Sequence, residues 1–163
     1  MRDDEAPDWL PELLPFTGDW STYVDTVYAE FRGDFFNHQV FFRGRRVSVR
    51  KEPRDQGKEA GFWHAISEGP KEMERTPDLR RCERVRWVRV LVESVDEASL
   101  PTWESKRGSD RRILIALPDF TYVVVLADRK RYVLFLTAFY IEQQHRRDKL
   151  KQEWEAWTQA QKG

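Results

Sequence analysis

The chain has 163 residues, of which 13% are aromatic, and its 28 basic and 28 acidic residues give a formal net charge of zero. Seven tryptophans argue against a disordered chain, because such side chains need burial or a partner. The apolar runs are much shorter than the ~20 residues of a membrane-spanning helix. A single cysteine, Cys82, excludes an internal disulfide and a zinc site built from several cysteines.

The first 16 residues are acidic and interrupted by prolines, and they lack the basic and apolar regions of a secretory signal. We therefore expect a cytoplasmic protein without a membrane segment. Thr17 or Asp19 can cap a helix over residues 20–31 that ends at Gly33. Its apolar face carries Tyr23, Val24, Val27 and Phe31.

Residues 39–52, "QVFFRGRRVSVRKE", predict a hairpin that turns at Gly44. "FWHAIS" (62–67) predicts a short strand or turn. Asp78 is the expected N-cap of one helix over residues 79–95. Its apolar side holds Val85, Val88, Leu91, Val92 and Val95.

Pro101 and Trp103 fall in a predicted loop. Three strands follow, "RRILIALP", "FTYVVVLAD" and "RYVLFLTAFY", and then a polar C-terminal helix over 141–163. This order predicts an α+β fold in which helices pack on a mainly antiparallel sheet of four to five strands. We expect one domain, 1–163, made of an acidic helical segment (1–34), a core (35–150) and the C-terminal helix.

Charge is unevenly distributed along the chain. Residues 1–36 hold nine acidic residues against two arginines, whereas residues 43–58 hold seven basic residues against two acidic ones. This asymmetry indicates either an anionic partner for the basic segment or an acidic helix that covers it. A solvated surface of mixed charge is the alternative, and charge alone favours it.

Three features carry possible chemistry. His64 follows two aromatic residues, and a histidine alone is more often structural than catalytic. Arg81 and Arg84 fall on the apolar side of the middle helix, where a guanidinium needs a carboxylate or a phosphate as its partner. Thr137 interrupts the last apolar strand, with Tyr140 three residues later. The histidines lack metal-ligand spacing, which argues against a metal site.

The succession "GFWHAIS", "RRCERVRW", "WESKRG" and "DFTYVVVLADRKRYVLFLTAFYI" resembles the phage-associated branch of the barnase–EndoU–colicin–RelE group of RNases. The resemblance covers roughly residues 35–150. It implies a barnase/RelE-like fold and metal-independent cleavage of RNA through attack by the ribose 2′-hydroxyl, with no cofactor. RNA is the implied substrate, and an antitoxin or immunity protein is a further partner that this reading suggests.

Carried onto this sequence, the resemblance implies catalytic roles for His64, Arg84, Thr137 and Tyr140. The implied substrate-binding residues are Lys58, Arg81, Arg46, Arg50 and Trp63. Which of Arg80, Arg81 and Arg84 faces the site stays open, and we favour Arg84. Trp63 can stack on a base or lie in the core, and the core is the stronger expectation.

Two other functional classes remain open. The first is a non-catalytic module that binds RNA or protein, in which His64 is a packing residue. The second is a structural phage protein that assembles through Trp154 and Trp157 of the tail. We expect instead that the tail folds back on its own sheet.

Overall fold

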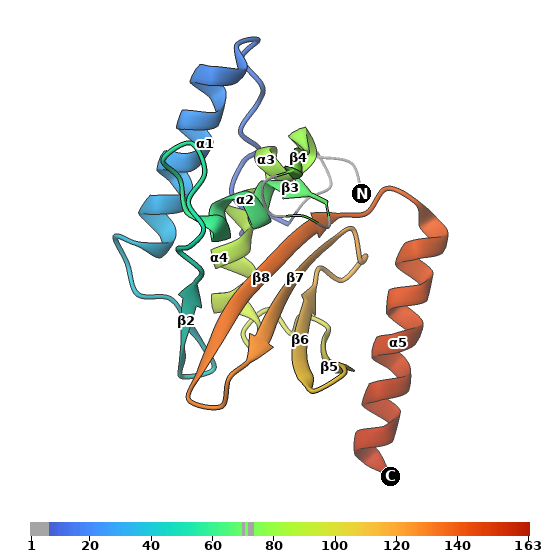
Figure 1. Ribbon diagram of the computed structural model, residues 1–163. Helices are drawn as coiled ribbons and strands as arrows, with labels where there is room; N and C mark the ends of the chain where they lie inside the picture. The colour runs from blue at the N-terminus through green and yellow to red at the C-terminus, as the bar shows by residue number, and fades with distance from the viewer. Residues whose placement is uncertain (1–6, 70, 72–73) are drawn as a thin grey trace.

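The computed structural model describes residues 7–69, 71 and 74–163. In this part of the chain the elements follow in the order α1 (Trp20–Phe35), β1 (Phe41–Phe42), β2 (Arg45–Val49), α2 (Ala60–Ile66), β3 (Ser67–Glu68), β4 (Thr76–Pro77), α3 (Leu79–Glu83), α4 (Trp87–Ser94), β5 (Thr102–Arg107), β6 (Asp110–Ala116), β7 (Tyr122–Asp128), β8 (Tyr132–Tyr140) and α5 (Gln144–Lys162) (Figure 1). Among the described helices, none has the length and apolar character that a membrane span requires.

The main sheet has the strand order β1-β2-β8-β7-β6-β5. β2 runs parallel to β8, and the other neighbouring pairs are antiparallel. The predicted α+β class with a mainly antiparallel sheet is therefore confirmed. The predicted hairpin is also present as β1 and β2, with Arg43 and Gly44 at positive φ in a two-residue turn.

This main sheet has six strands, so the prediction of four to five strands is too low. The strand missed by the sequence reading is β5, which was expected to be a loop and pairs along its whole length with β6. Trp103 is its one large apolar residue, and charged residues occupy much of the rest. Such a composition is typical of an edge strand, where charge discourages pairing with other chains.

The segment predicted as a strand or turn at "FWHAIS" is instead helix α2. All seven of its residues are buried, so its sequence lacks the periodic pattern of apolar and polar residues that predicts an amphipathic helix. Gly61 permits the close approach of this helix to β2: a Cβ built there would lie 2.1 Å from Cγ1 of Val49. The Gly61 N–H also donates to the Arg50 carbonyl at 2.8 Å.

The middle helix is broken rather than continuous. Asp78 caps α3 as predicted, accepting a hydrogen bond from the Arg80 N–H at 2.9 Å. The helix ends at Glu83, and α4 begins at Trp87. The predicted apolar positions Val85, Val88, Leu91, Val92 and Val95 are all buried.

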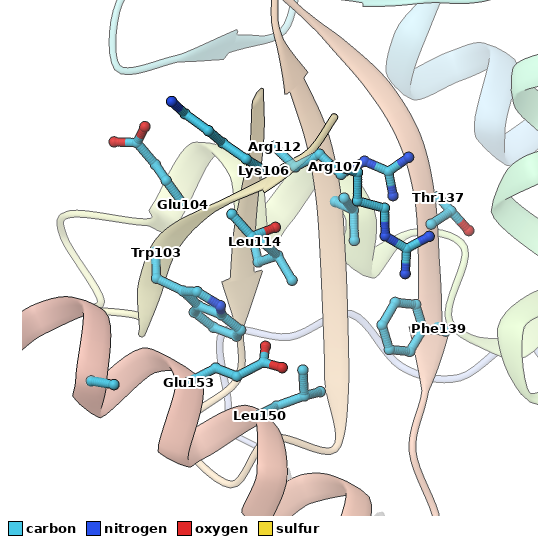
Figure 2. Close-up of a pocket in the computed structure, with 13 residues that line it drawn as sticks. Trp103, Glu104, Lys106, Arg107, Arg112, Leu114, Thr137, Phe139, Leu150 and Glu153 are labelled. Carbon is cyan, nitrogen blue, oxygen red and sulfur yellow. The ribbon is translucent and has the colours of Figure 1, made fainter. Parts of the chain in front are cut away.

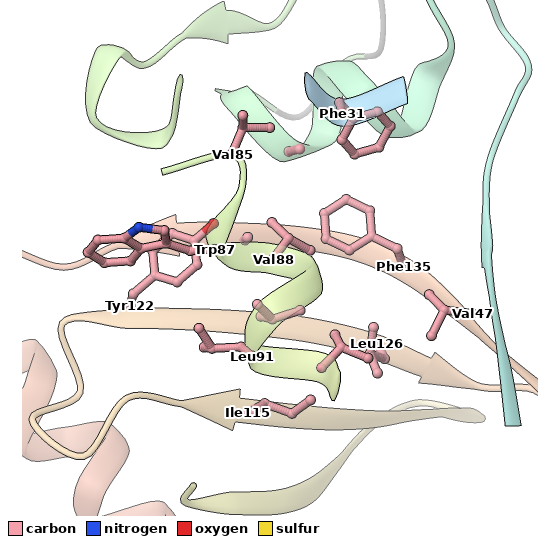
Figure 3. Packing of buried hydrophobic residues seen from close by; sticks show 14 of the residues in the cluster. Phe31, Val47, Val85, Trp87, Val88, Leu91, Ile115, Tyr122, Leu126 and Phe135 are labelled. Carbon is pink, nitrogen blue, oxygen red and sulfur yellow. The ribbon is translucent and has the colours of Figure 1, made fainter. Parts of the chain in front are cut away.

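Helices α1 to α4 share the main core with one face of the sheet. Figure 3 shows Val88 and Leu91 of α4 among the inward-facing side chains of the strands. The Trp87 ring meets Tyr122 edge to face, with their centroids 5.5 Å apart. The face that positions the candidate site is therefore built on a continuous hydrophobic cluster.

Helix α1 belongs to this core. Asp19 caps it, and Tyr23, Val24, Val27 and Phe31 are buried as predicted. The helix continues through Gly33 to Phe35, two residues beyond the expected end. Because its inner face is fully packed, α1 is an integral layer of the fold and not a detachable cover over the basic segment.

The opposite sheet face carries α5 (Figure 1). Trp154 and Trp157 pack, partly buried, against the cluster around Trp103 and Phe120, as expected for a tail that folds back on its own sheet. The Phe120 and Trp154 ring centroids are 5.8 Å apart. No residue of α5 is fully buried, so this helix covers the second face only in part.

Candidate functional site

His64 lies in the last turn of α2 and is 9% exposed. The helix packs against β8, and the Thr137 hydroxyl donates a hydrogen bond of 3.0 Å to the His64 carbonyl oxygen. These two residues, which are 73 positions apart, are thus joined through the backbone of one and the side chain of the other. The bond fixes the C-terminal turn of α2 on the strand.

Irregular pairing shapes this part of β8. The strand pairs with β2 only from Tyr132 to Phe135. On its other side, the register with β7 shifts between Val125 and Leu126. A bulge of this kind re-aims the side chains that follow it. Beyond it, Thr137 and Tyr140 lie where α2 and α3 contact the strand.

Arg84 stands at the break between α3 and α4 and is only 5% exposed. Its guanidinium carbon lies 4.0 Å from the centroid of the Tyr140 ring and 5.2 Å from that of Trp87. Its Nη1 donates to the Arg80 carbonyl at 3.0 Å. A buried guanidinium over two aromatic faces gains cation–π attraction, which partly offsets the cost of its burial.

Tyr122 contacts the backbone of Arg84. Its hydroxyl donates to the Arg84 carbonyl at 3.4 Å, and burial raises the pKa of this phenol above its usual value. The group therefore remains a protonated donor at neutral pH. Its hydrogen bond holds the backbone of the break.

A cleft of about 520 Å³ opens beside Tyr140. We call it the arginine cleft, and it is lined by Glu68, Pro77, Asp78, Leu79, Arg80, Arg81, Phe139, Tyr140, Glu142, Gln143 and Arg146. Three arginines and two aromatic rings give it the chemistry of a phosphate site next to a flat, apolar surface.

Carboxylates already engage two of these arginines, Arg80 and Arg81. Arg80 forms an ion pair with Glu142, and its guanidinium carbon lies 5.7 Å from the Tyr140 ring centroid. Arg81 donates to the Ser67 carbonyl at 2.7 Å and lies 3.5 Å from a Glu68 carboxylate oxygen. An incoming anion therefore has to compete with Glu68 and Glu142.

The structure separates the other predicted substrate-binding residues from this cleft. Lys58 pairs with Asp25 of α1 at 3.1 Å and lies over the Tyr28 ring. Trp63 is 8% exposed, and its Nε1–H donates to the Asp55 carbonyl at 3.0 Å, so it has the expected core role. Arg46 and Arg50 are exposed on and just beyond β2, away from the lining of the cleft.

Sequence reasoning missed Glu68, Glu142 and Arg146 of the cleft. It predicted Arg81 as a substrate-binding residue and favoured Arg84 over Arg80 and Arg81 as the arginine that faces the site. Arg80 and Arg81 both line the cleft, whereas Arg84 lies behind it against Tyr140. The position of Arg146 follows from the turn between β8 and α5, which brings the first residues of α5 next to α3. No sequence motif marks that turn. The basic residues after "FYIEQQ" were the one feature of the sequence that could have indicated Arg146 as a cleft residue.

No family model, curated protein or solved structure matches this chain. The resemblance to the barnase–EndoU–colicin–RelE group therefore stays a prediction from short sequence motifs.

Proposed function

We propose that this chain is a metal-independent endoribonuclease whose reacting groups lie where α2, the α3–α4 break and the end of β8 meet. One observation carries the proposal: His64 and Arg84, from two other stretches of sequence, contact the end of β8 at Thr137 and Tyr140. Thr137 holds the carbonyl of His64, and the Arg84 guanidinium lies on the Tyr140 ring. The arginine cleft opens at the same place.

The reaction needs a proton carrier and a charge neutraliser. A base takes the proton of the ribose 2′-hydroxyl, the 2′ oxygen bonds to the adjacent phosphorus, and the P–O5′ bond breaks as an acid protonates the leaving oxygen. Imidazole can do either transfer near neutral pH, which is the role we assign to His64. Arg84 lies behind the Tyr140 ring, and its positive charge stabilises through space the negative charge that develops on the phosphorane.

The two β8 residues then have different roles. The Thr137 hydroxyl is engaged by the His64 carbonyl, so we assign Thr137 as a positioning residue that fixes α2. Tyr140 lines the cleft, holds Arg84 through its ring and presents its hydroxyl to a phosphate oxygen. Arg80 and Arg81 bind flanking phosphates after these displace the carboxylates of Glu142 and Glu68.

The finer expectations belong to the same proposal. They are a barnase/RelE-like version of the α+β fold, action in the cytoplasm, and an antitoxin or immunity protein that masks the cleft. We expect an inhibitor of this kind to present carboxylates, because carboxylates of the chain itself already pair with Arg80 and Arg81 in the cleft.

A non-catalytic RNA- or protein-binding module is the second candidate, and the burial of His64 favours it. His64 is 9% exposed and is not among the described residues that line the arginine cleft. In this reading His64 packs α2 on β8, and the cleft binds its partner without cutting it.

Cleavage of mixed RNA in EDTA separates the two candidates. We expect the wild type to leave 2′,3′-cyclic phosphate and 5′-hydroxyl ends, and His64→Ala to cut at least 100-fold more slowly, the scale of general acid–base catalysis. Arg84→Lys keeps the charge but loses the planar guanidinium, and we expect a comparable loss.

His145→Ala is the matched control, because His145 is exposed on α5. It should cut like the wild type. Circular dichroism must show that His64→Ala remains folded; if it does not, His64→Gln takes its place. Intact RNA from folded wild-type protein contradicts the nuclease proposal and leaves the binding module.

A further inference from the structure

A second cavity lies on the other side of Phe139, between the open sheet face and α5 (Figure 2). This sheet-face groove has a volume of about 760 Å³, and strands β5 to β8 form its floor. Leu114, Val125 and Phe139 contribute apolar surface, while Leu150 and Ala156 of α5 form one wall. None of the functional assignments above uses it.

One end of the groove carries basic side chains, and two carboxylates, Glu104 and Glu153, also line the groove. Lys106, Arg107 and Arg112 line it from the β5–β6 hairpin. In Figure 2 the guanidinium groups of Arg107 and Arg112 extend toward Thr137 and Phe139. Among the residues that the structure describes, the Arg112 guanidinium has one weak partner, an Asp110 carboxylate oxygen at 3.4 Å. Among the described residues, no ion pair engages Arg107, whose side chain is exposed.

The groove also holds a polar atom without a protein partner. Trp103 lines it and is 1% exposed, yet its Nε1–H has no hydrogen-bond acceptor among the residues described here. Guanidinium groups and an apolar floor together suit a nucleotide, which supplies phosphate and a flat base.

The groove is linked to the arginine cleft through β8. Phe139 lines both cavities, and Thr137 lines the groove while its hydroxyl bonds to His64. A chain that leaves the cleft at Tyr140 therefore meets Phe139 next and then the two guanidinium groups. Bases and phosphates alternate along a single strand, which suits this alternation of aromatic and basic surface.

We propose that the sheet-face groove holds the part of a single-stranded RNA next to the scissile bond. Phe139 stacks on a base, and Arg107 and Arg112 bind the phosphates that flank it. This inference rests on the proposed function, because the occupant is the strand to be cut. An acidic protein segment is the competing occupant, and the apolar floor favours RNA, since a base uses that surface and an acidic segment does not.

Binding of a fluorescent RNA oligonucleotide with 2′-O-methyl riboses tests the proposal in the full chain. The 2′-O-methyl groups remove the nucleophile, so affinity is measured without cleavage. We expect Arg107→Gln with Arg112→Gln to weaken binding about tenfold and to reduce the slope of log K against log salt by about 1.4, the value for two lost contacts to single-stranded phosphates. Phe139→Leu should weaken binding of this RNA roughly tenfold, but not binding of an RNA with an abasic site at the stacked position.

Lys130→Gln with Arg131→Gln is the matched control, because it also removes two exposed positive charges, from the β7–β8 turn. It should change affinity less than twofold. Equal affinities of the two double variants overturn the proposal. A second result also overturns it: polyglutamate competes as strongly as RNA, and the abasic site does not change the affinity of the RNA. The groove would then recognise acidic protein.

The same variants separate this inference from the proposed nuclease activity. If Arg107→Gln with Arg112→Gln weakens binding and the wild type does not cut RNA, the groove is an RNA-binding surface and the nuclease proposal fails. If the wild type cuts RNA and this double variant binds and cuts equally well, the nuclease proposal stands and the groove assignment fails.

Discussion

At the scale of single residues, Glu59 is the most heavily engaged carboxylate of the described chain. Its side chain is 4% exposed, accepts a hydrogen bond of 2.7 Å from the Tyr28 hydroxyl, and pairs with Arg32 at 3.3 Å and Arg54 at 3.4 Å. Glu59 immediately precedes α2, so these contacts tie the helix that carries His64 to α1. The site and the core therefore share this carboxylate.

Glu59→Gln should lower the free energy of unfolding by about 2 kcal/mol at neutral pH, the scale of hydrogen bonds to a charged group. Burial raises the pKa of Glu59, but the bond from Tyr28 and the charges of Arg54 and Arg32 outweigh it, and the net pKa is lowered. Because the pKa of Glu59 is lower in the folded protein than in the unfolded chain, its carboxylate stabilises the fold fully at pH values above the unfolded pKa of about 4.3. This contribution disappears as the pH falls through the folded pKa. Urea unfolding should therefore show the two proteins converging below about pH 4.

Glu93→Gln supplies the comparison. Glu93 pairs with Arg89 one helical turn away, and its side chain is 38% exposed. A pair of this kind contributes less than about 0.5 kcal/mol. An equal loss of stability in the two variants would show that the buried position of Glu59 adds nothing.

At the scale of elements, the sequence predicted regular strands and helix faces, but it did not predict features that depend on contacts between distant residues. β6 to β8 and the inner face of α1 follow from residue periodicity, and all are present. The break at residues 84–86 has no signal, because "ERVRW" holds neither proline nor glycine. It accompanies the contact of Arg84 with Tyr140, which is 56 positions away. Lys58 was misplaced for the same kind of reason, since its pairing with α1 depends on the tertiary fold.

Substituting alanine for two helical glycines should change the stability of the fold in opposite directions. Gly61→Ala should destabilise the fold by about 2 kcal/mol, because its Cβ would collide with Val49 and has the Arg50 carbonyl at 3.2 Å. Gly33→Ala in α1 meets nothing within 4 Å and should stabilise by about 0.5–1 kcal/mol through helix propensity. Thermal unfolding followed by circular dichroism measures both, and a loss at Gly33 would contradict the open space around it.

At the scale of the whole molecule, the charge asymmetry of the sequence is dispersed by folding. Basic residues of segment 43–58 pair with carboxylates from several elements, including Asp96, Asp128 and Asp25. The interpretation that an acidic helix covers the basic segment therefore accounts for only part of these ion pairs. Sequence identified the residues around Tyr140, but the carboxylates that compete for the arginine cleft depend on how α3, β3 and the start of α5 meet.

The two terminal helices should respond in opposite ways to removal. Deleting residues 1–33 takes five buried side chains (Leu10, Tyr23, Val24, Val27 and Phe31) out of the main core, and we expect no cooperative unfolding transition from the product. Deleting residues 144–163 removes only partly buried side chains, Leu150, Trp154 and Trp157. We expect this product to unfold cooperatively in urea with a stability lower by about 3 kcal/mol, because each half-buried large side chain contributes roughly 1 kcal/mol. Its exposed Trp103 and Phe120 should bind more of a hydrophobic dye than the full chain does. A cooperative transition in the chain without α1, or none in the chain without α5, would reverse the assignment of which helix the core requires.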